Sequence, residues 1–562
     1  MPEGPAIDVP SDTGHSGDPV DADTARLHEL GYAQELRRKL GTFSNFAISF
    51  SIISVLAGAI TTFWLGMYAG GPLVITLCWV VVGVFSLVVG SSMAEICSAY
   101  PTAGGLYFWS ATLARRRKAL WAWWTGWFNL IGQIGVIASV DFALANFILL
   151  SINIFGSATS PTIEINRWSI FITYLLVLVV HGLLNTFGVN LVRVLGDVSV
   201  WWHLGGVAVI VAVLFLFSEP GNLGMSNVLQ YRNGTGWEFP GVGIYVALVG
   251  LLLAQYTITG FDASAHVSEE TKDAAVAAPK AMVRSIYISA IAALILSVAM
   301  VQAIPASAYD EIAAKGILAG PNVFLLGVVG TLGKLLVIIS TIGQFFCGMA
   351  SVTANSRMIY AFSRDGGLPG SRIWSRVNPR TRTPTNSVWF GIGLAAAIGL
   401  LSLIQTDLAY PVAFFALTGV AVIGLYISYV IPVFLRLRNP GFVPGPWNLG
   451  RWSRIIGWTA VIWVGIIAVV FCLPVFNPWN TLETFNFTGP ILLLCAILVG
   501  GGWSLSAKNH FTGPKSMGSL EEIMAIESEL DAEERQMELR HTHKLPAGAQ
   551  SDGRHPGGIG KE

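Results

Sequence analysis

Twelve runs of about 20 mostly apolar residues follow one another along the chain, and no other feature restricts its fold so strongly. A run of this length is what an α-helix needs to cross the hydrocarbon core of a bilayer. The runs are apolar on every side, which distinguishes them from the amphipathic helices of a soluble protein. The sequence therefore predicts an all-α integral membrane protein with about twelve spans, near residues 43–65, 73–94, 121–150, 168–188, 194–217, 241–265, 282–303, 335–356, 386–404, 410–435, 456–475 and 487–505.

The low charge of the chain agrees with this fold class. Charged residues make up 12% of the 562 residues, whereas globular proteins carry about 25%. The 33 basic and 33 acidic residues cancel, so nothing indicates a nucleic-acid partner. The five cysteines lie in or beside apolar runs without metal-ligand spacing, and no nucleotide-binding loop or catalytic-triad pattern is present. We therefore expect a protein that is surrounded by lipid, is not an enzyme, and binds no metal or cofactor.

The distribution of Lys and Arg predicts the orientation of the spans. With both termini inside, the inner connections hold 18 of these residues and the outer ones four, namely Arg167, Arg232, Lys315 and Lys334. We expect a plasma membrane protein with a cytoplasmic N-terminal tail and short amphipathic helix (1–40), a membrane domain (41–505) and a cytoplasmic C-terminal tail (506–562). An acidic helix in that last tail is predicted to start with a capping box at Ser519 and Glu522. Residues 1–24 and those from about 541 have the composition of disordered tails.

Two of the runs contain islands of small and hydroxylated residues that favour a break in the helix. The first surrounds Gly58 within 54–62, and the second surrounds Gly260 within 255–264. Unwound backbone is expensive in lipid and is kept where it lines a cavity, so it marks a functional site by default. The two runs are five spans apart, which is typical of an inverted repeat with a binding site at the midplane. Tight packing through small residues is the alternative interpretation.

Three motifs carry a family resemblance, at residues 95–109 (EICSAYPTAGGLYFW), 260–271 (GFDASAHVSEET) and 356–369 (SRMIYAFSRDGGLP). They resemble the segments that follow the second, sixth and eighth spans of the amino acid–polyamine–organocation transporters. The segment at 30–47 is similar to the amino acid/choline transporter branch of that superfamily. The resemblance covers roughly 27–505. It implies a five-plus-five inverted repeat, at about 43–217 and 241–435, and two extra helices at about 456–505.

The resemblance also implies where a substrate binds. Its α-carboxylate would meet the first break at Ser54, Ala57 and Gly58. Its ammonium would meet the carbonyl groups of Ile258 and Thr259 in the second break. Many relatives have Gly-x-Gly in the first break, whereas this chain has Ser-Val-Leu-Ala-Gly. The departure therefore leaves open two other substrates, a less generic amino acid or a ligand without an α-carboxylate.

Three further residues of the second break are candidates. Phe261 stands where the family often has a gating aromatic side chain, and Tyr256 is the alternate candidate. Asp262 follows the break and could bind a substrate amine, a proton or the neighbouring helix.

His203 is the candidate coupling residue. Aligning Asp197 with an acid common in relatives puts His203 where several proton-dependent or sodium-independent members carry a lysine. With an ordinary pKa near 6.5, a histidine could gain and lose a proton in each transport cycle. A neutral histidine held in a helix interface is the alternative, and a sodium site using Ser351 or Thr353 is the competing idea. Asp141 could face an outer cation pathway or cap a nearby helix.

Several charged residues fall near the predicted cytoplasmic face, and we interpret them as an inner gate or a loop-fixing network of ion pairs. They are Glu95, Glu269, Glu270, Arg357 and Asp365. His181 and His266 are expected to satisfy packing demands only.

The leading hypothesis is secondary active transport. We expect proton-coupled uptake of an amino acid or a related small amine such as γ-aminobutyrate by alternating access. An amino acid or amine exchanger, or a choline or polyamine permease of the same fold, is the alternative. A channel is disfavoured because no ring-forming filter motif is present.

Overall fold

The computed structural model describes residues 22–156, 161–187, 189–378, 381–403 and 412–542. Most of the tail residues for which the sequence predicts disorder lie outside these ranges. The described chain is almost entirely α-helical, as predicted, with one short antiparallel strand pair, β1 (Ala69–Gly70) and β2 (Arg232–Asn233). The helices are α1 Ala22–Glu29, α2 Thr42–Ile52, α3 Phe63–Tyr68, α4 Gly71–Ala99, α5 Gly105–Leu113, α6 Lys118–Phe155, α7 Arg167–Phe187, α8 Val189–Leu216, α9 Val242–Gly250, α10 Leu252–Thr257, α11 Ala263–His266, α12 Ala274–Gln302, α13 Tyr309–Ala313, α14 Ala319–Gly327, α15 Leu332–Arg364, α16 Ser371–Trp374, α17 Thr385–Gly399, α18 Val412–Leu437, α19 Ser453–Val470, α20 Thr488–Leu505 and α21 Leu520–Thr542.

Eleven helices in the described ranges are long and apolar enough to cross a membrane. The sixth predicted span is not among them because it is divided into α9, α10 and α11. Its longest continuous apolar stretch, Val242–Thr257, is too short by itself. The first span is also interrupted: α2 ends at Ile52, a π-helical turn called η1 covers Val55–Ala59, and α3 follows. The two breaks therefore occur in the two spans for which the sequence predicts them.

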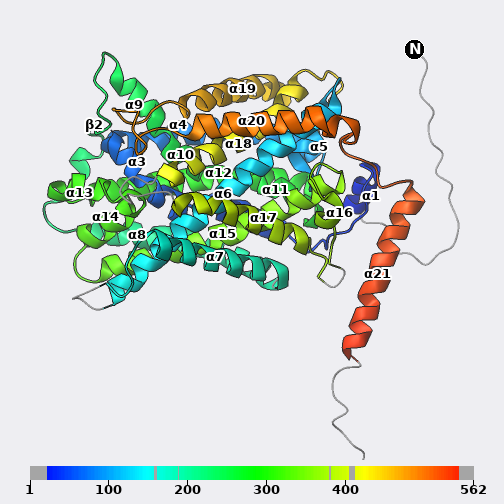
Figure 1. Cartoon of the computed structure of the whole chain (residues 1–562), viewed down its shortest axis with the longest axis horizontal. Helices are drawn as coiled ribbons and strands as arrows, with labels where there is room; N and C mark the ends of the chain where they lie inside the picture. The colour runs from blue at the N-terminus through cyan, green and yellow to red at the C-terminus, as the bar shows by residue number, and fades with distance from the viewer. Residues whose placement is uncertain (1–21, 157–160, 188, 379–380, 404–411, 543–562) are drawn as a thin grey trace, which may run out of the picture.

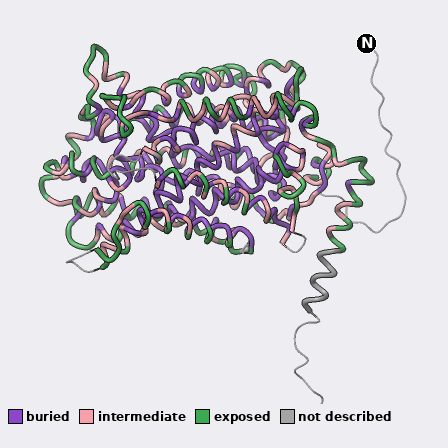
Figure 2. Tube along the Cα trace, in the orientation of Figure 1, coloured by how far each residue is buried: buried purple, intermediate pink, exposed green. Residues whose placement is uncertain are grey.

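The helices run side by side along the long axis of the molecule (Figure 1). Helix α6 lies in the middle, in contact with α15 and α18, while α12 packs along α4. The last two spans, α19 and α20, lie on one outer side. Of the most apolar window of the α20 span only 11% is buried, against 83% for the α6 span. Figure 2 shows the same gradient from a buried centre to exposed outer helices. Apolar side chains exposed in this way are stable when lipid surrounds them.

Both terminal segments lie at one end of the helix bundle, which we call the terminal face. Helices α1, α5 and α16 and the start of α21 lie there, whereas β2, α13 and α14 mark the opposite face (Figure 1). The predicted capping box of α21 is confirmed, since Glu522 accepts from the Ser519 N–H at 2.7 Å and Ser519 Oγ accepts from the Glu522 N–H at 3.3 Å. The helix of the N-terminal tail ends early, at Glu29, and Leu36 beyond it is buried in protein.

Glu95, at the end of α4, fastens this helix to the connection between α18 and α19. Its carboxylate accepts hydrogen bonds from Arg436 and from the Ser453 hydroxyl, and from the Leu449 N–H at 3.2 Å. None of these partners belongs to the predicted inner-gate set. Because the Glu95 side chain is 3% exposed and that of Arg436 is 13% exposed, removing the carboxylate charge leaves a cation with little access to water.

We expect Glu95→Gln to lower the free energy of unfolding by about 3 kcal/mol, the usual cost of breaking a buried ion pair. Thermal unfolding of the detergent-purified protein measures this loss. Glu311→Gln is the matched control, because Glu311 pairs with Lys315 at 3.3 Å with both side chains largely exposed. That control should cost less than about 1 kcal/mol. Equal stability of the two variants would contradict the structural role of Glu95.

Candidate functional site

The first break is organised by Ser54. The residue has extended backbone angles, and its hydroxyl accepts a hydrogen bond from the Ala57 N–H at 3.1 Å. A hydroxylated residue in this position caps the helical turn that follows, because the first N–H groups of a helix have no partner within it. The local sequence therefore explains the break, because a capping serine stands directly before η1.

The second break spans the five residues between α10 and α11 and depends on Gly260. This residue has φ +86°, and a Cβ atom at its position would lie 2.2 Å from Cγ2 of Ile52. Glycine is the residue that adopts this conformation without strain. The unwound backbone is held by two tyrosines of α18: Tyr426 donates to the Ile258 carbonyl at 2.7 Å, and the Tyr429 hydroxyl accepts from the Gly260 N–H at 3.2 Å.

The sequence analysis missed Tyr426 and Tyr429. Two buried hydroxyl groups three residues apart in an apolar span were the available signal, because each hydroxyl needs a partner in lipid. The partners of these two hydroxyl groups depend on how α18 is rotated toward α10, and sequence patterns do not predict this rotation.

The two breaks touch. A Cβ atom on Gly58 would lie 2.5 Å from Oγ1 and 2.9 Å from Cα of Thr257, so the backbones approach more closely than any other residue would allow. Beside this contact lies a cavity of about 10 Å³. Its lining from the two broken spans consists of Ile52, Ser54, Ala57, Gly58, Thr61, Tyr256, Thr257 and Thr259, and α6 and α15 complete it.

This cavity contains most of the predicted substrate-binding residues. Ser54, Ala57, Gly58, Tyr256 and Thr259 all line it. Its volume is about what one water molecule needs, so the structure represents a state closed around the site. The opposite face is closed over it by aromatic side chains, where Trp64 lies 6.3 Å from Phe415 and 6.4 Å from Phe476 between ring centres.

Phe261 lies outside this cavity. Its ring packs against Tyr429 at 4.8 Å and Tyr426 at 6.0 Å between ring centres, and it is completely buried. The predicted gating aromatic therefore faces α18 in this state. The alternate candidate, Tyr256, borders the cavity and bonds through its hydroxyl to the Ser139 hydroxyl at 2.8 Å.

Asp262 is the centre of a buried polar network. It accepts from Tyr429 at 2.6 Å, Asn129 at 3.0 Å and Gln133 at 3.3 Å, and its Oδ2 lies 3.2 Å from Nε2 of His266. The other ring nitrogen of His266 lies 3.1 Å from the Ala103 carbonyl. Both nitrogens thus face acceptors, so either the imidazole or the carboxylate must carry an extra proton for both contacts to be hydrogen bonds. His266 does more than satisfy packing.

His203 lies directly against the first break. Its Nε2 is 2.6 Å from Ser54 Oγ, and its Nδ1 is 2.8 Å from the carbonyl of Ser199 on the same helix. The carbonyl accepts, so Nδ1 carries a hydrogen, and Nε2 can accept from the serine as a neutral ring. Helix α15 reaches the same break through Ser340, which donates to the Leu56 carbonyl at 2.7 Å. Spans one, five and eight therefore meet at the first break.

The other polar candidates point elsewhere. Asp141 forms a completely buried pair with His181, 3.1 Å between Oδ2 and Nδ1. Thr353 donates to Asn185 at 2.6 Å, away from the first break, and Ser351 bonds to a carbonyl of its own helix at 2.8 Å. No cluster of three metal-ligating side chains occurs in the described ranges.

Ion pairs and tyrosines close the terminal face beneath the site. Arg357 binds Glu270 through two hydrogen bonds of 2.7 and 3.3 Å. A neighbouring set, which we call the terminal lock, joins the N-terminal segment to the ends of the sixth and eighth spans and consists of Tyr32, Glu35, Glu269, Arg364 and Asp365.

Within the terminal lock, Arg364 bonds to Glu269 at 3.3 Å and lies 4.0 Å from the centre of the Tyr32 ring. Asp365 accepts from Tyr32 at 3.2 Å, and from the Lys515 N–H of the C-terminal tail at 3.1 Å. Burial raises the pKa of the Glu35 and Asp365 carboxyl groups. Of the predicted inner-gate residues, Glu269, Glu270, Arg357 and Asp365 lie together here, and Glu95 does not.

We expect Gly58→Ala to destabilise the protein by about 1–3 kcal/mol, because the new methyl group meets the backbone of Thr257. Gly205→Ala in α8 is the control, since a Cβ atom there meets nothing within 4 Å. Thermal unfolding of both variants in detergent checks this. A Gly58 variant as stable as the Gly205 variant would show that the two breaks do not need to touch.

Comparison with known proteins identifies the family. The model of a family described as amino acid permease matches residues 40–497. The amino-acid permease BAT1 of Arabidopsis thaliana is 41% identical over 88% of this chain and 97% of its own length, and its homologue from Oryza sativa is 40% identical over 90% and 98%. A putative polyamine transporter of Candida albicans is 28% identical over 90% and 91%. The chain belongs to the amino acid permease family, and it is a multi-pass membrane transporter for amino acids or amines.

Proposed function

We propose that this permease takes up an amino acid or a related small amine by alternating access, coupled to protons. The observation that carries the proposal is the direct contact of two helix breaks beside a buried cavity lined by Ser54, Gly58 and Thr259. In the closed state the Gly58 N–H donates to the Ser54 carbonyl at 2.8 Å, and the Ile258 carbonyl accepts from Tyr426 at 2.7 Å. A bound substrate would replace such partners at N–H groups of the first break and at carbonyl groups of the second. Such a pair of groups suits a zwitterion, with the carboxylate toward the first break and the ammonium toward the second.

Opening must enlarge the site, since the present cavity of about 10 Å³ cannot hold an amino acid. Release toward the terminal face requires α2 to separate from α8 and α15, and the terminal lock to open. Release toward the opposite face requires Trp64 to leave Phe415 and Phe476. We propose that the terminal face is cytoplasmic, as the excess of Lys and Arg in its connections indicates, and that the host membrane is the plasma membrane.

The test of this function is uptake by the purified full-length protein in sealed vesicles. Candidate substrates are first selected by thermal stabilisation, which rises as RT ln(1 + [L]/Kd) and detects weak ligands at high concentration. The panel holds amino acids, γ-aminobutyrate, choline and polyamines. We expect an amino acid or γ-aminobutyrate to stabilise the protein and to accumulate when an inward proton gradient is imposed.

Other results would change the proposal in defined ways. Transport only into vesicles preloaded with a second substrate would replace uptake by exchange. Stabilisation by choline or polyamines alone would favour the amine permease, for which the similarity to the putative polyamine transporter is the supporting observation. Transport that does not saturate with concentration would contradict a carrier altogether.

We propose that His203 couples the proton to the first break, because its ring bonds directly to Ser54. A bound proton on Nε2 would remove the acceptor for the Ser54 hydroxyl and so disturb the cap of η1. The pair of Asp262 and His266 is the second candidate, since its geometry requires a proton in the second break.

Two variants separate these sites. We expect His203→Gln to flatten the pH dependence of uptake while substrate still stabilises the protein, and His266→Gln to keep the wild-type profile. A flat profile in His266→Gln alone would move the proton site to the second break. Unchanged profiles in both would exclude coupling through either histidine.

A further inference from the structure

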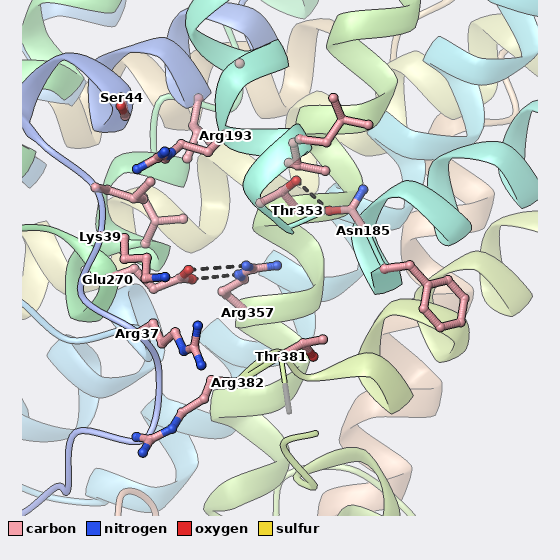
Figure 3. Close-up of a pocket in the computed structure, with 17 residues that line it drawn as sticks. Arg37, Lys39, Ser44, Asn185, Arg193, Glu270, Thr353, Arg357, Thr381 and Arg382 are labelled. Atoms are coloured by element: carbon pink, nitrogen blue, oxygen red, sulfur yellow. Dashed lines mark hydrogen bonds and ion pairs between the residues drawn. The ribbon is translucent and has the colours of Figure 1, made fainter. Parts of the chain in front are cut away.

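The terminal face contains a second and much larger cavity, of about 500 Å³, apart from the cavity at the two breaks (Figure 3). It is bounded by the starts of α2 and α8, the terminal-face ends of α7 and α15, the segment after α11 and the segment before α17. These elements come from distant parts of the chain. We call this space the basic cavity.

The basic cavity collects positive charge. Five basic residues line it and only one acidic residue does, Glu270, which is occupied by the two hydrogen bonds from Arg357. Figure 3 shows these basic side chains around the cavity. Two of them, Lys39 and Arg193, form no ion pair with any residue in the described ranges. The other three are Arg37, Arg357 and Arg382.

The neighbouring carboxylates offset only part of this charge. Asp197, one helical turn after Arg193, accepts a hydrogen bond from the Ser44 hydroxyl at 3.2 Å and keeps its negative charge. Asp531 of α21 pairs with Arg382 at 2.5 Å. The five basic residues still outnumber the acidic ones, and like charges around one cavity repel, so an anion that enters between them is stabilised. Arg and Lys together offer the donors that a phosphate group accepts.

Two residues that line the basic cavity are apolar and exposed. Phe187 at the end of α7 is 75% exposed, and Leu191 at the start of α8 is 48% exposed. They belong to spans whose outer surfaces face lipid, at the depth where the spans end. Exposed apolar side chains beside exposed basic ones match a molecule with a charged head and a hydrocarbon chain, whereas a free anion would contact the basic residues alone.

We propose that the basic cavity binds the phosphate of an anionic phospholipid from the leaflet at the terminal face. Clusters of basic residues between spans are known to attract such head groups, and each basic residue adds to the attraction at the membrane surface. The phosphate lies between Lys39 and Arg193, and an acyl chain follows Phe187 and Leu191. Because Lys39 lies just before α2 and Arg193 belongs to α8, the bound lipid holds the two helices together and favours the closed terminal face.

The test compares the full-length protein in nanodiscs of phosphatidylcholine alone with nanodiscs that also contain phosphatidylglycerol. We expect phosphatidylglycerol to raise the unfolding temperature of the wild type by several degrees and to remain bound in native mass spectrometry. The double variant Lys39→Gln, Arg193→Gln should lose most of this rise and the bound lipid. Both residues are exposed at the surface, so the variant should unfold like the wild type in phosphatidylcholine alone.

The control is Arg451→Gln, Arg454→Gln at the start of α19, which removes the same charge from the terminal face at two exposed positions away from the cavity. This control variant should keep the rise in unfolding temperature that phosphatidylglycerol causes in the wild type. An equal loss in both double variants would mean general attraction to a charged surface and would overturn the proposed site. Inorganic phosphate added to the protein in phosphatidylcholine nanodiscs tests the source of the anion. If inorganic phosphate raises the unfolding temperature as much as phosphatidylglycerol does, the proposed role of the acyl chain is overturned.

Discussion

The contact between Gly58 and the backbone of Thr257 is the constraint on which the rest of the site depends. Each span that breaks in the bilayer must find partners for the backbone groups that it frees. In the first span Ser54 provides the partner itself, and in the second Tyr426 and Tyr429 provide it from α18. The first break is therefore fixed by a residue of its own span and the second by the neighbouring α18, and the contact at Gly58 sets how close the two backbones come.

The sequence predicted the two breaks correctly because small and hydroxylated residues are unusual in the middle of an apolar run. The family resemblance singled out His203 as a position where relatives carry a lysine, and the structure shows that its ring lies against Ser54. The sequence could not predict that Phe261 faces α18 or that Glu95 pairs with Arg436, because these contacts depend on how each helix is rotated about its axis. Family resemblance assigns a residue to a position in the chain, whereas the packing of the neighbouring span decides which way its side chain points.

Asp262 shows how a single acidic residue can hold several elements at once. The sequence left three roles open for it, and the structure surrounds it with donors from α6, α11 and α18. A carboxylate with this many donors is stable in a buried site only while they all remain in place. Movement of the second break relative to α6 would therefore have to exchange these hydrogen bonds for others, from water or from substrate, in a single step.

The two faces of the protein are closed by different physical interactions. The opposite face is closed by packed aromatic rings, Trp64 stacked on Phe476 and edge-to-face with Phe415, whose separation exposes apolar surface at a cost of about 25 cal/mol for each Å². The terminal face is closed by ion pairs and hydrogen bonds, and water replaces these when the groups separate at the membrane surface. The net cost of opening the terminal face is therefore smaller than its number of polar contacts suggests. It also depends on the N-terminal and C-terminal segments, which supply Tyr32 and the Lys515 N–H to these contacts.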